Sequence, residues 1–241
     1  MNGDSKRADE WLQNAIDVLD GLVVDFPDVS RYKYDLADTL RLADPTSESS
    51  PTQYRRRIER AVAICEEITA AYPNVPHYQA LLADSLSERA AIRRGAGQLK
   101  AAEQDYERAV ECQESLLAQF GSVATFRLAH VQSLHGLAVL KRQNGQADQS
   151  RKLLDTAIRH LDQWVATAGY NRKYQLLYSP LYSSLSETLV DLGEEELARK
   201  ASVKAERAKP TPSTNGSRRP SPFGGRRPGP AGRDFRSPPS R

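Results

Sequence analysis

The chain has 241 residues, of which 39% are hydrophobic, 27% are charged and 7% are aromatic, with a formal net charge of +3. This composition is typical of a soluble, charge-rich protein with a thin, extended core, and it lacks the run of roughly 20 apolar residues that a membrane-spanning helix needs. Because the polar start MNGDSKRADE is unlike a signal sequence, we expect a cytoplasmic protein that makes no membrane contact.

A repeated pattern runs along the whole chain from its beginning to the basic tail. Related phrases around one alanine read NAIDVLD, RAVAICE, RAVECQE and TAIRHLD, and VKAERA is a weaker copy. The phased alanines are Ala15, Ala61, Ala109, Ala157 and Ala205. Aromatic residues keep the same phase at Tyr32, Tyr78, Phe126 and Tyr174. A period of this kind, here about 48 residues, indicates stacked copies of one structural unit.

The first seven residues, 1–7, are expected to be disordered, and the array is expected to span residues 8–208. Its opening segment, with Ala8, Leu12 and Ala15, matches only the second half of a repeat. Either a partner, another subunit or a preceding domain covers the open side of this segment, or the chain is truncated. Truncation or domain loss is the explanation that we favour.

Each full repeat is predicted to be a pair of helices. Ser50 as N-cap and Pro51 at the first helical position predict a helix over residues 51–71, which YPNVP ends. A second helix begins near Pro76 and ends at the GAG of 95–97. No segment shows the alternation of a strand, so we expect an all-α protein. Stacked hairpins bury the apolar stripes, and the phased alanines mark the closest approaches.

The spacing of Gly97, Ala102, Tyr106 and Ala109 resembles the second half of the tetratricopeptide repeat (TPR), although the repeated unit is longer than is usual in that family. The resemblance implies a right-handed α-solenoid of about four to five TPR-like helical hairpins. Arrays with such long helices also look like the C-terminal arrays of bacterial Ser/Thr kinases or anti-sigma-type signalling proteins.

In the TPR family the first helix of each hairpin lines a concave groove. The resemblance therefore implies nine candidate contact residues for a protein or peptide partner: Arg41, Asp84, Ser87, Arg94, Gln132, His135, Arg142, Ser183 and Glu187. The family's clamp for peptide carboxylates uses Lys and Asn. Because the matched positions hold Arg41, Ser87, His135 and Ser183, we do not expect a receptor for chaperone tails.

The sequence shows no constellation for catalysis, a metal or a cofactor, and we expect no enzymatic activity. Cys65 and Cys112 lie at similar points of successive repeats, which indicates buried apolar positions and no disulfide. The four histidines lack metal-ligand spacing, and His130 stands where the repeat elsewhere has leucine, so it is interpreted as a packed or surface residue.

Residues 209–241 form a basic tail rich in Pro, Arg and Gly, which we expect to be disordered. From Pro210 onwards the tail holds seven Arg and one Asp. Arg218, Arg219, Arg226 and Arg227 are candidate contacts for RNA or another anionic surface.

The sequence as a whole favours a noncatalytic protein–protein interaction scaffold. Two alternatives stay open. In the first alternative, the chain is a detached C-terminal regulatory region of a bacterial Ser/Thr kinase or anti-sigma-type protein. In the second, its tail binds RNA or an anionic surface. The identity of the partner and the oligomeric state do not follow from the sequence.

Overall fold

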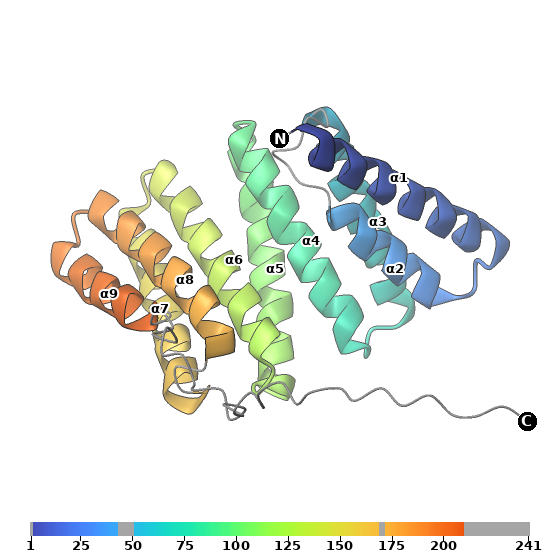
Figure 1. Cartoon of the computed structure of the whole chain (residues 1–241). Coiled ribbons are helices and arrows are strands. Elements are labelled where there is room, and N and C mark those ends of the chain that lie inside the picture. Colours follow the sequence, from blue (N-terminus) through green and yellow to red (C-terminus); the bar gives the residue numbers. More distant parts are fainter. Residues whose placement is uncertain (1, 43–50, 169–171, 210–241) are drawn as a thin grey trace, which may run out of the picture. The chain divides into compact units, whose positions relative to one another are not determined.

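The computed structural model describes residues 2–42, 51–168 and 172–209 (Figure 1). These residues form nine α-helices and no strand. The helices are α1 (Asn2–Asp25), α2 (Ser30–Arg41), α3 (Pro51–Ala71), α4 (Pro76–Gly95), α5 (Leu99–Phe120), α6 (Ala124–Gln143), α7 (Ala147–Ala168), α8 (Arg172–Asp191) and α9 (Glu195–Ala208). The expected all-α fold is confirmed, and the helices predicted over 51–71 and from Pro76 are present.

Consecutive helices pair into hairpins, and each hairpin packs against the next (Figure 1). The pairs are α2 with α3, α4 with α5, α6 with α7, and α8 with α9, while α1 packs against α2. The first helices of successive hairpins also contact one another, because α4 lies between α2 and α6, and α6 between α4 and α8. This is the predicted solenoid of TPR-like helical hairpins.

Three hairpins turn at a glycine with the same backbone conformation. The φ angles of Gly97, Gly145 and Gly193 are +75°, +75° and +78°. Residues with a side chain rarely adopt such angles, whereas glycine has no Cβ to clash. The amide after each glycine donates to a carbonyl of the last helical turn: Gln98 to Arg93, Gln146 to Lys141 and Glu194 to Leu189. One helix-ending joint therefore recurs at the same point of three successive repeats.

At three of the four hairpins, a phased aromatic residue packs against an aromatic residue at the end of the preceding helix or just beyond it. Edge-to-face ring pairs join Phe26 to Tyr32 at 6.0 Å, Tyr72 to Tyr78 at 6.1 Å and Phe120 to Phe126 at 6.4 Å between centroids. Such pairs stabilise packing beyond the area that they bury. The fourth expected anchor, Tyr174, lies outside the side chains that the structure describes.

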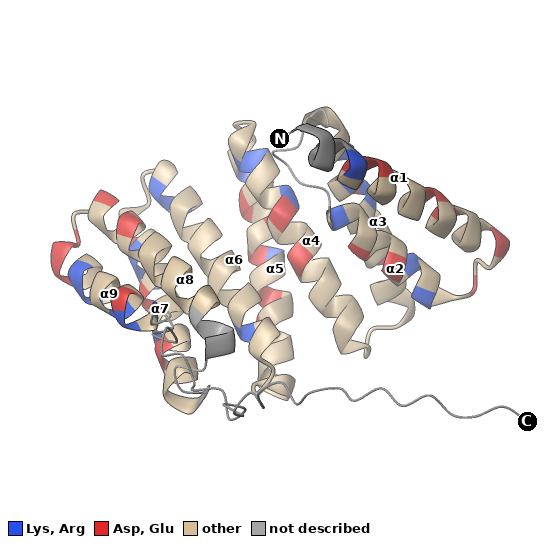
Figure 2. Cartoon of the chain, in the orientation of Figure 1, with Lys and Arg blue, Asp and Glu red and all other residues tan. Residues whose placement is uncertain are grey.

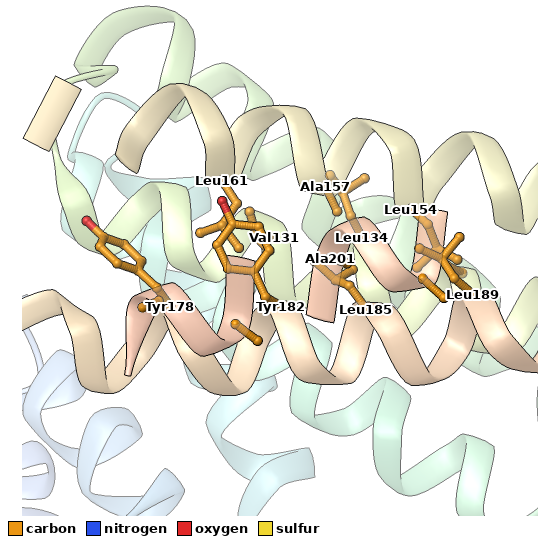
Figure 3. Packing of buried hydrophobic residues seen from close by; sticks show 14 of the residues in the cluster. Val131, Leu134, Leu154, Ala157, Leu161, Tyr178, Tyr182, Leu185, Leu189 and Ala201 are labelled. Carbon is orange, nitrogen blue, oxygen red and sulfur yellow. The ribbon is translucent and has the colours of Figure 1, made fainter. Parts of the chain in front are cut away.

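The apolar core consists of two large clusters and a small one between them. The first large cluster joins α1 to α5 and contains Ala61 and Ala109. The second joins α6 to α9 and contains Ala157, with Tyr178 and Tyr182 among its largest side chains (Figure 3). A small cluster around Tyr106, with residues from α4, α5 and α6, lies between them. The phased alanines Ala61, Ala109 and Ala157 are fully buried, as their packing role requires.

The beginning of the chain differs from expectation. Residues 1–7 were expected to be disordered, whereas α1 begins at Asn2. No proline interrupts this polar stretch, so the helix continues outward from its packed part. On α1, Ala15 is exposed, and Trp11 and Val18 are 72% and 64% exposed, so this helix presents an apolar strip without a neighbour among the described helices. Ser50 and the tail from 210 onwards lie outside the described residues.

Candidate functional site

Two adjoining pockets open where α2, α4 and α6 meet. The first pocket, of about 190 Å³, is lined by Tyr34, Asp38, Arg41, His77, Ala80, Leu81, Asp84, Gln113, Leu116, Thr125, Phe126 and Ala129. The second, of about 290 Å³, is lined by Arg41, Asp84, Ser87, Glu88, Thr125, Leu128, Ala129, Gln132 and Ser133. Because they share Arg41, Asp84, Thr125 and Ala129, they form one groove, called here the α2–α4–α6 groove.

An acidic cluster surrounds one arginine in this groove. The Arg41 guanidinium, whose side chain is only 16% exposed, lies 2.6 Å from Glu88 and 3.7 Å from both Asp38 and Asp84. The ion pair with Glu88 ties the end of α2 to α4. Burial raises the pKa of Asp84 to about 6, although Arg41 opposes this shift. The charged residues belong to α2 and α4, whereas the middle of α6 carries none (Figure 2).

One residue that lines the first pocket has a buried amide. Gln113 on α5 is 1% exposed, and neither its amide oxygen nor its nitrogen has a hydrogen-bond partner among the described residues. A buried polar group left in this state costs roughly 1 to 3 kcal/mol of stability. The apolar residues Leu116 and Phe126 line the same pocket and are at most 9% exposed. The pocket therefore combines apolar walls with unsatisfied polar atoms, as ligand sites commonly do.

Four of the nine candidate residues meet in this groove, namely Arg41, Asp84, Ser87 and Gln132. Ser87 shares a 2.7 Å hydrogen bond with Ser133, which joins α4 to α6. The role of all nine residues in binding stays a prediction.

The other five candidate residues lie outside the two pockets. His135 forms a 2.9 Å hydrogen bond with Thr188 of α8, and burial, with a contribution from Arg94, lowers its pKa. Arg142 forms an ion pair with Asp191 of α8 at 3.2 Å. His135 and Arg142 therefore both connect α6 to α8. Ser183 and Glu187 lie on α8. The nine residues thus do not converge on one site.

Gln113 was not predicted from the sequence, because the expected groove consists only of the first helices of the hairpins and Gln113 lies on the second helix of its hairpin, α5. A signal was nevertheless present in the repeat, since three of the four residues in phase with Gln113, namely Leu19, Cys65 and Leu161, are apolar, and only the weak last copy has a polar one, Lys209. A polar residue at a core position of one copy marks a site where that copy differs in function or packing. Tyr34, Asp38, His77, Glu88 and Thr125 also line the groove and were not predicted.

Other expected features can be located as well. Cys65 and Cys112 are free; Cys65 is buried, which raises the pKa of its thiol to about 12, and Cys112 is half-buried. In the described part of the chain no three His, Cys, Asp or Glu side chains gather as metal ligands. Among the helices described, none is both long and apolar enough to cross a bilayer. Arg218, Arg219, Arg226 and Arg227 lie outside the described residues.

Comparison with solved structures finds several that are similar to this chain. A variant of the nearly identical TPR-like repeats of a putative kinesin light chain from Podosopora anserina matches 85% of this chain and 90% of its own, with a TM-score of 0.50 and 16% identity. MamA matches 86% and 93%, with a TM-score of 0.48 and 14% identity. BtubC (BKLC) from P. vanneervenii matches 86% and 94%, with a TM-score of 0.44 and 15% identity.

No protein-family model and no curated protein matches the sequence. The likeness to the kinesin light chain repeats shows that the fold is TPR-like. The looser resemblance to arrays of bacterial signalling proteins stays a prediction.

Proposed function

We propose that this protein is a noncatalytic scaffold that binds a protein or peptide partner in the α2–α4–α6 groove. The observation that carries the proposal is the buried, unpartnered amide of Gln113, a residue that lines a pocket built from three successive hairpins. A partner group that hydrogen-bonds to Gln113 removes the penalty of an unsatisfied polar group. Arrays of stacked repeats commonly bind partners along such a continuous surface.

The experiment that tests this function blocks the groove and asks whether a partner is lost. The full chain is used as bait in native lysate, and the retained proteins and nucleic acids are identified at low and high salt. In Ala129→Trp a large side chain replaces the alanine at one of the four positions common to both pockets. Ala118→Trp makes the same change at an exposed position of α5 and is the matched control. Circular dichroism checks that both variants fold.

A protein retained by the wild type and by Ala118→Trp, but not by Ala129→Trp, supports binding in the groove. Retention of the same proteins by all three chains contradicts it. A fourth chain, with Arg218, Arg219, Arg226 and Arg227 changed to serine, tests the tail. If the bait retains only RNA, at low salt, and loses it in this fourth chain, the function belongs to the tail, because binding through phosphate contacts weakens steeply with salt.

A further inference from the structure

The charges in the α2–α4–α6 groove indicate the chemistry of its ligand, and this inference rests on the proposed function. The carboxylates of Asp38, Asp84 and Glu88 face a single guanidinium, that of Arg41. When all four groups are ionised, two negative charges remain uncompensated. A partly buried site with this imbalance favours a cation, because opposite charges attract more strongly where water is excluded.

The arrangement leaves oxygen atoms available for that cation. Arg41 hydrogen-bonds to Glu88 at 2.6 Å. Asp38 and Asp84 lie 3.7 Å from the same guanidinium, which is beyond hydrogen-bond distance. These two carboxylates therefore keep oxygens that a second charged donor can approach, and both line the first pocket.

The walls of the first pocket suit a long aliphatic side chain. Leu81, Leu116 and Phe126 provide apolar surface in the pocket that Asp38 and Asp84 also line, and Gln113 of the same lining has an amide oxygen without a hydrogen-bond partner among the described residues. Lysine and arginine bury an apolar stem while the charged end stays among polar groups. The volume of about 190 Å³ lies below the roughly 300 Å³ at which pockets for drug-sized ligands begin, so it fits one side chain.

We propose that the first pocket binds the side chain of a lysine or arginine from a peptide partner. Its stem packs against Leu116 and Phe126, and its charged end lies between Asp38, Asp84 and Gln113. The charge that this pocket selects is opposite to that bound by a clamp for peptide carboxylates.

The protonation of Asp84 gives the proposal a second readout. Burial raises the pKa of this carboxyl to about 6, and a cation bound beside it favours the charged form. Binding then releases a proton, so affinity falls as pH decreases through this range. The polar and titratable groups that share the groove with Asp84 are Tyr34, Asp38 and Arg41 on α2, His77 and Glu88 on α4, Gln113 on α5 and Thr125 on α6. Because His77 is also titratable, the pH series includes His77→Gln.

The test uses nuclear magnetic resonance on the full chain labelled with ¹⁵N. The side-chain amide signals of Gln113 report directly on the pocket, and they are assigned by their loss in Gln113→Leu. The probes are short blocked peptides of glycine and serine whose central residue is lysine, arginine, norleucine or glutamate. We expect the lysine or arginine peptide to shift the Gln113 signals saturably. The norleucine peptide should bind about tenfold more weakly or worse, because it lacks the charged donor.

Matched variants separate the pocket from the rest of the surface. Asp84→Asn should lower the affinity for the lysine peptide by about tenfold. Asp155→Asn removes an equal charge at an exposed position of α7 and should leave the affinity unchanged. Acidification from about pH 7 to about pH 5 should weaken binding to the wild type and to His77→Gln, but not further to Asp84→Asn. Gln113→Leu introduces the residue found in phase at Leu19 and Leu161, and it should fold but bind poorly. Because this variant lacks the Gln113 amide, its affinity is measured from the backbone amide signals of the pocket residues Leu81 and Ala129.

Several results would overturn the inference. These are equal shifts from the lysine and norleucine peptides, tighter binding of the glutamate peptide, no shift with any peptide, or unchanged affinity in both Asp84→Asn and Gln113→Leu. Failure here is distinct from failure of the proposed function. If Ala129→Trp loses a partner while no peptide shows a preference for a cation, the groove still binds that partner and only the lysine or arginine pocket is wrong.

Discussion

Gly136 lies in the middle of α6 because Tyr106 leaves no space for a larger residue. A Cβ atom at this position would lie 2.5 Å from Cε1 and 2.7 Å from the hydroxyl of Tyr106, whose side chain is buried. Gly136→Ala should therefore lower the free energy of unfolding by about 1 to 3 kcal/mol, although alanine is the better helix former. Urea denaturation measures the change.

The control for this prediction is Gly21→Ala in α1. A Cβ atom at Gly21 meets nothing within 4 Å, so alanine should stabilise the protein by up to about 1 kcal/mol. If Gly136→Ala were also stabilising, the close approach of α6 to Tyr106 would be wrong.

His130 makes stability depend on pH. Its ring is fully buried without a hydrogen-bond partner among the described residues, and burial, helped by His160 at 5.0 Å between ring centroids, lowers its pKa to about 4. In the unfolded chain a histidine titrates near pH 6.5, so unfolding takes up a proton between these values. The contribution of neutral His130 to the free energy of unfolding is fully present above pH 6.5. It is lost progressively as pH falls towards 4, by on the order of 3 kcal/mol.

The variant His130→Leu tests this dependence, because leucine occupies the same phase at Leu36 and Leu82. The difference in unfolding free energy between the variant and the wild type should widen steadily from pH 7 to pH 4. Chemical denaturation at several pH values measures it, and taking the difference removes the contributions of groups that do not interact with His130. A difference that stays constant with pH would contradict the assigned pKa.

At the scale of elements, one ion-pair cluster holds the hairpin of α4 and α5 together. Asp105 on α5 has a side chain that is only 3% exposed, and it accepts two hydrogen bonds from Arg89, at 2.7 and 2.8 Å, and one from Arg93 at 2.7 Å. Paired geometry of this kind is strong, but a charge left without its partner is costly. The residues in phase with Asp105 are Arg57, Leu153 and Ala201, so this cluster is particular to one hairpin.

Asp105→Ala should destabilise the protein by about 3 to 5 kcal/mol, because two partly buried guanidinium groups lose their carboxylate. Glu59→Ala removes the partner of Arg55 in an exposed pair of α3 and should cost no more than about 0.5 kcal/mol. Thermal denaturation of both variants provides the comparison. Similar losses in the two variants would show that burial of the Asp105 cluster contributes nothing extra.

At the scale of the whole helical unit, Tyr106 couples two halves. It belongs to the small cluster between the large cluster of α1 to α5 and that of α6 to α9. Stacked repeats unfold together only while the interfaces between neighbours are strong enough. Tyr106→Ala, which removes a buried aromatic ring and costs roughly 3 to 5 kcal/mol, should make the halves unfold separately.

Two probes distinguish joint from separate unfolding. Trp164 is buried in the cluster of α6 to α9, whereas Trp11 is 72% exposed, so tryptophan fluorescence reports mainly on the second half. Circular dichroism reports on all helices. The two transitions should coincide in the wild type and in the control Tyr72→Ala, whose ring is partly exposed, and should separate in Tyr106→Ala. Coincident transitions in Tyr106→Ala would show that the halves are coupled elsewhere.

The features that recur from copy to copy could be predicted from the sequence, whereas the features that occur in a single copy could not. The buried alanines Ala61, Ala109 and Ala157, the phased aromatic residues and the turn between α3 and α4 follow from signals that recur in several copies. Gln113, Asp105 and His130 are polar residues within the core of single copies, and only the packing of neighbouring helices decides whether such a residue lines a pocket, binds an arginine or stays neutral. The groove combines side chains from four helices, and no periodicity contains that information.

Gly97, Gly145 and Gly193 define the step by which such a chain can grow or shrink. Each lies one full repeat from the next and adopts nearly the same φ, so a segment cut after one of them and ended at the next begins and ends at equivalent points. Tandem duplication of that segment would add a whole hairpin, and its deletion would remove one, with each joint kept intact. Array length can therefore change by gene rearrangement in single steps, while the side chains within each step diverge independently.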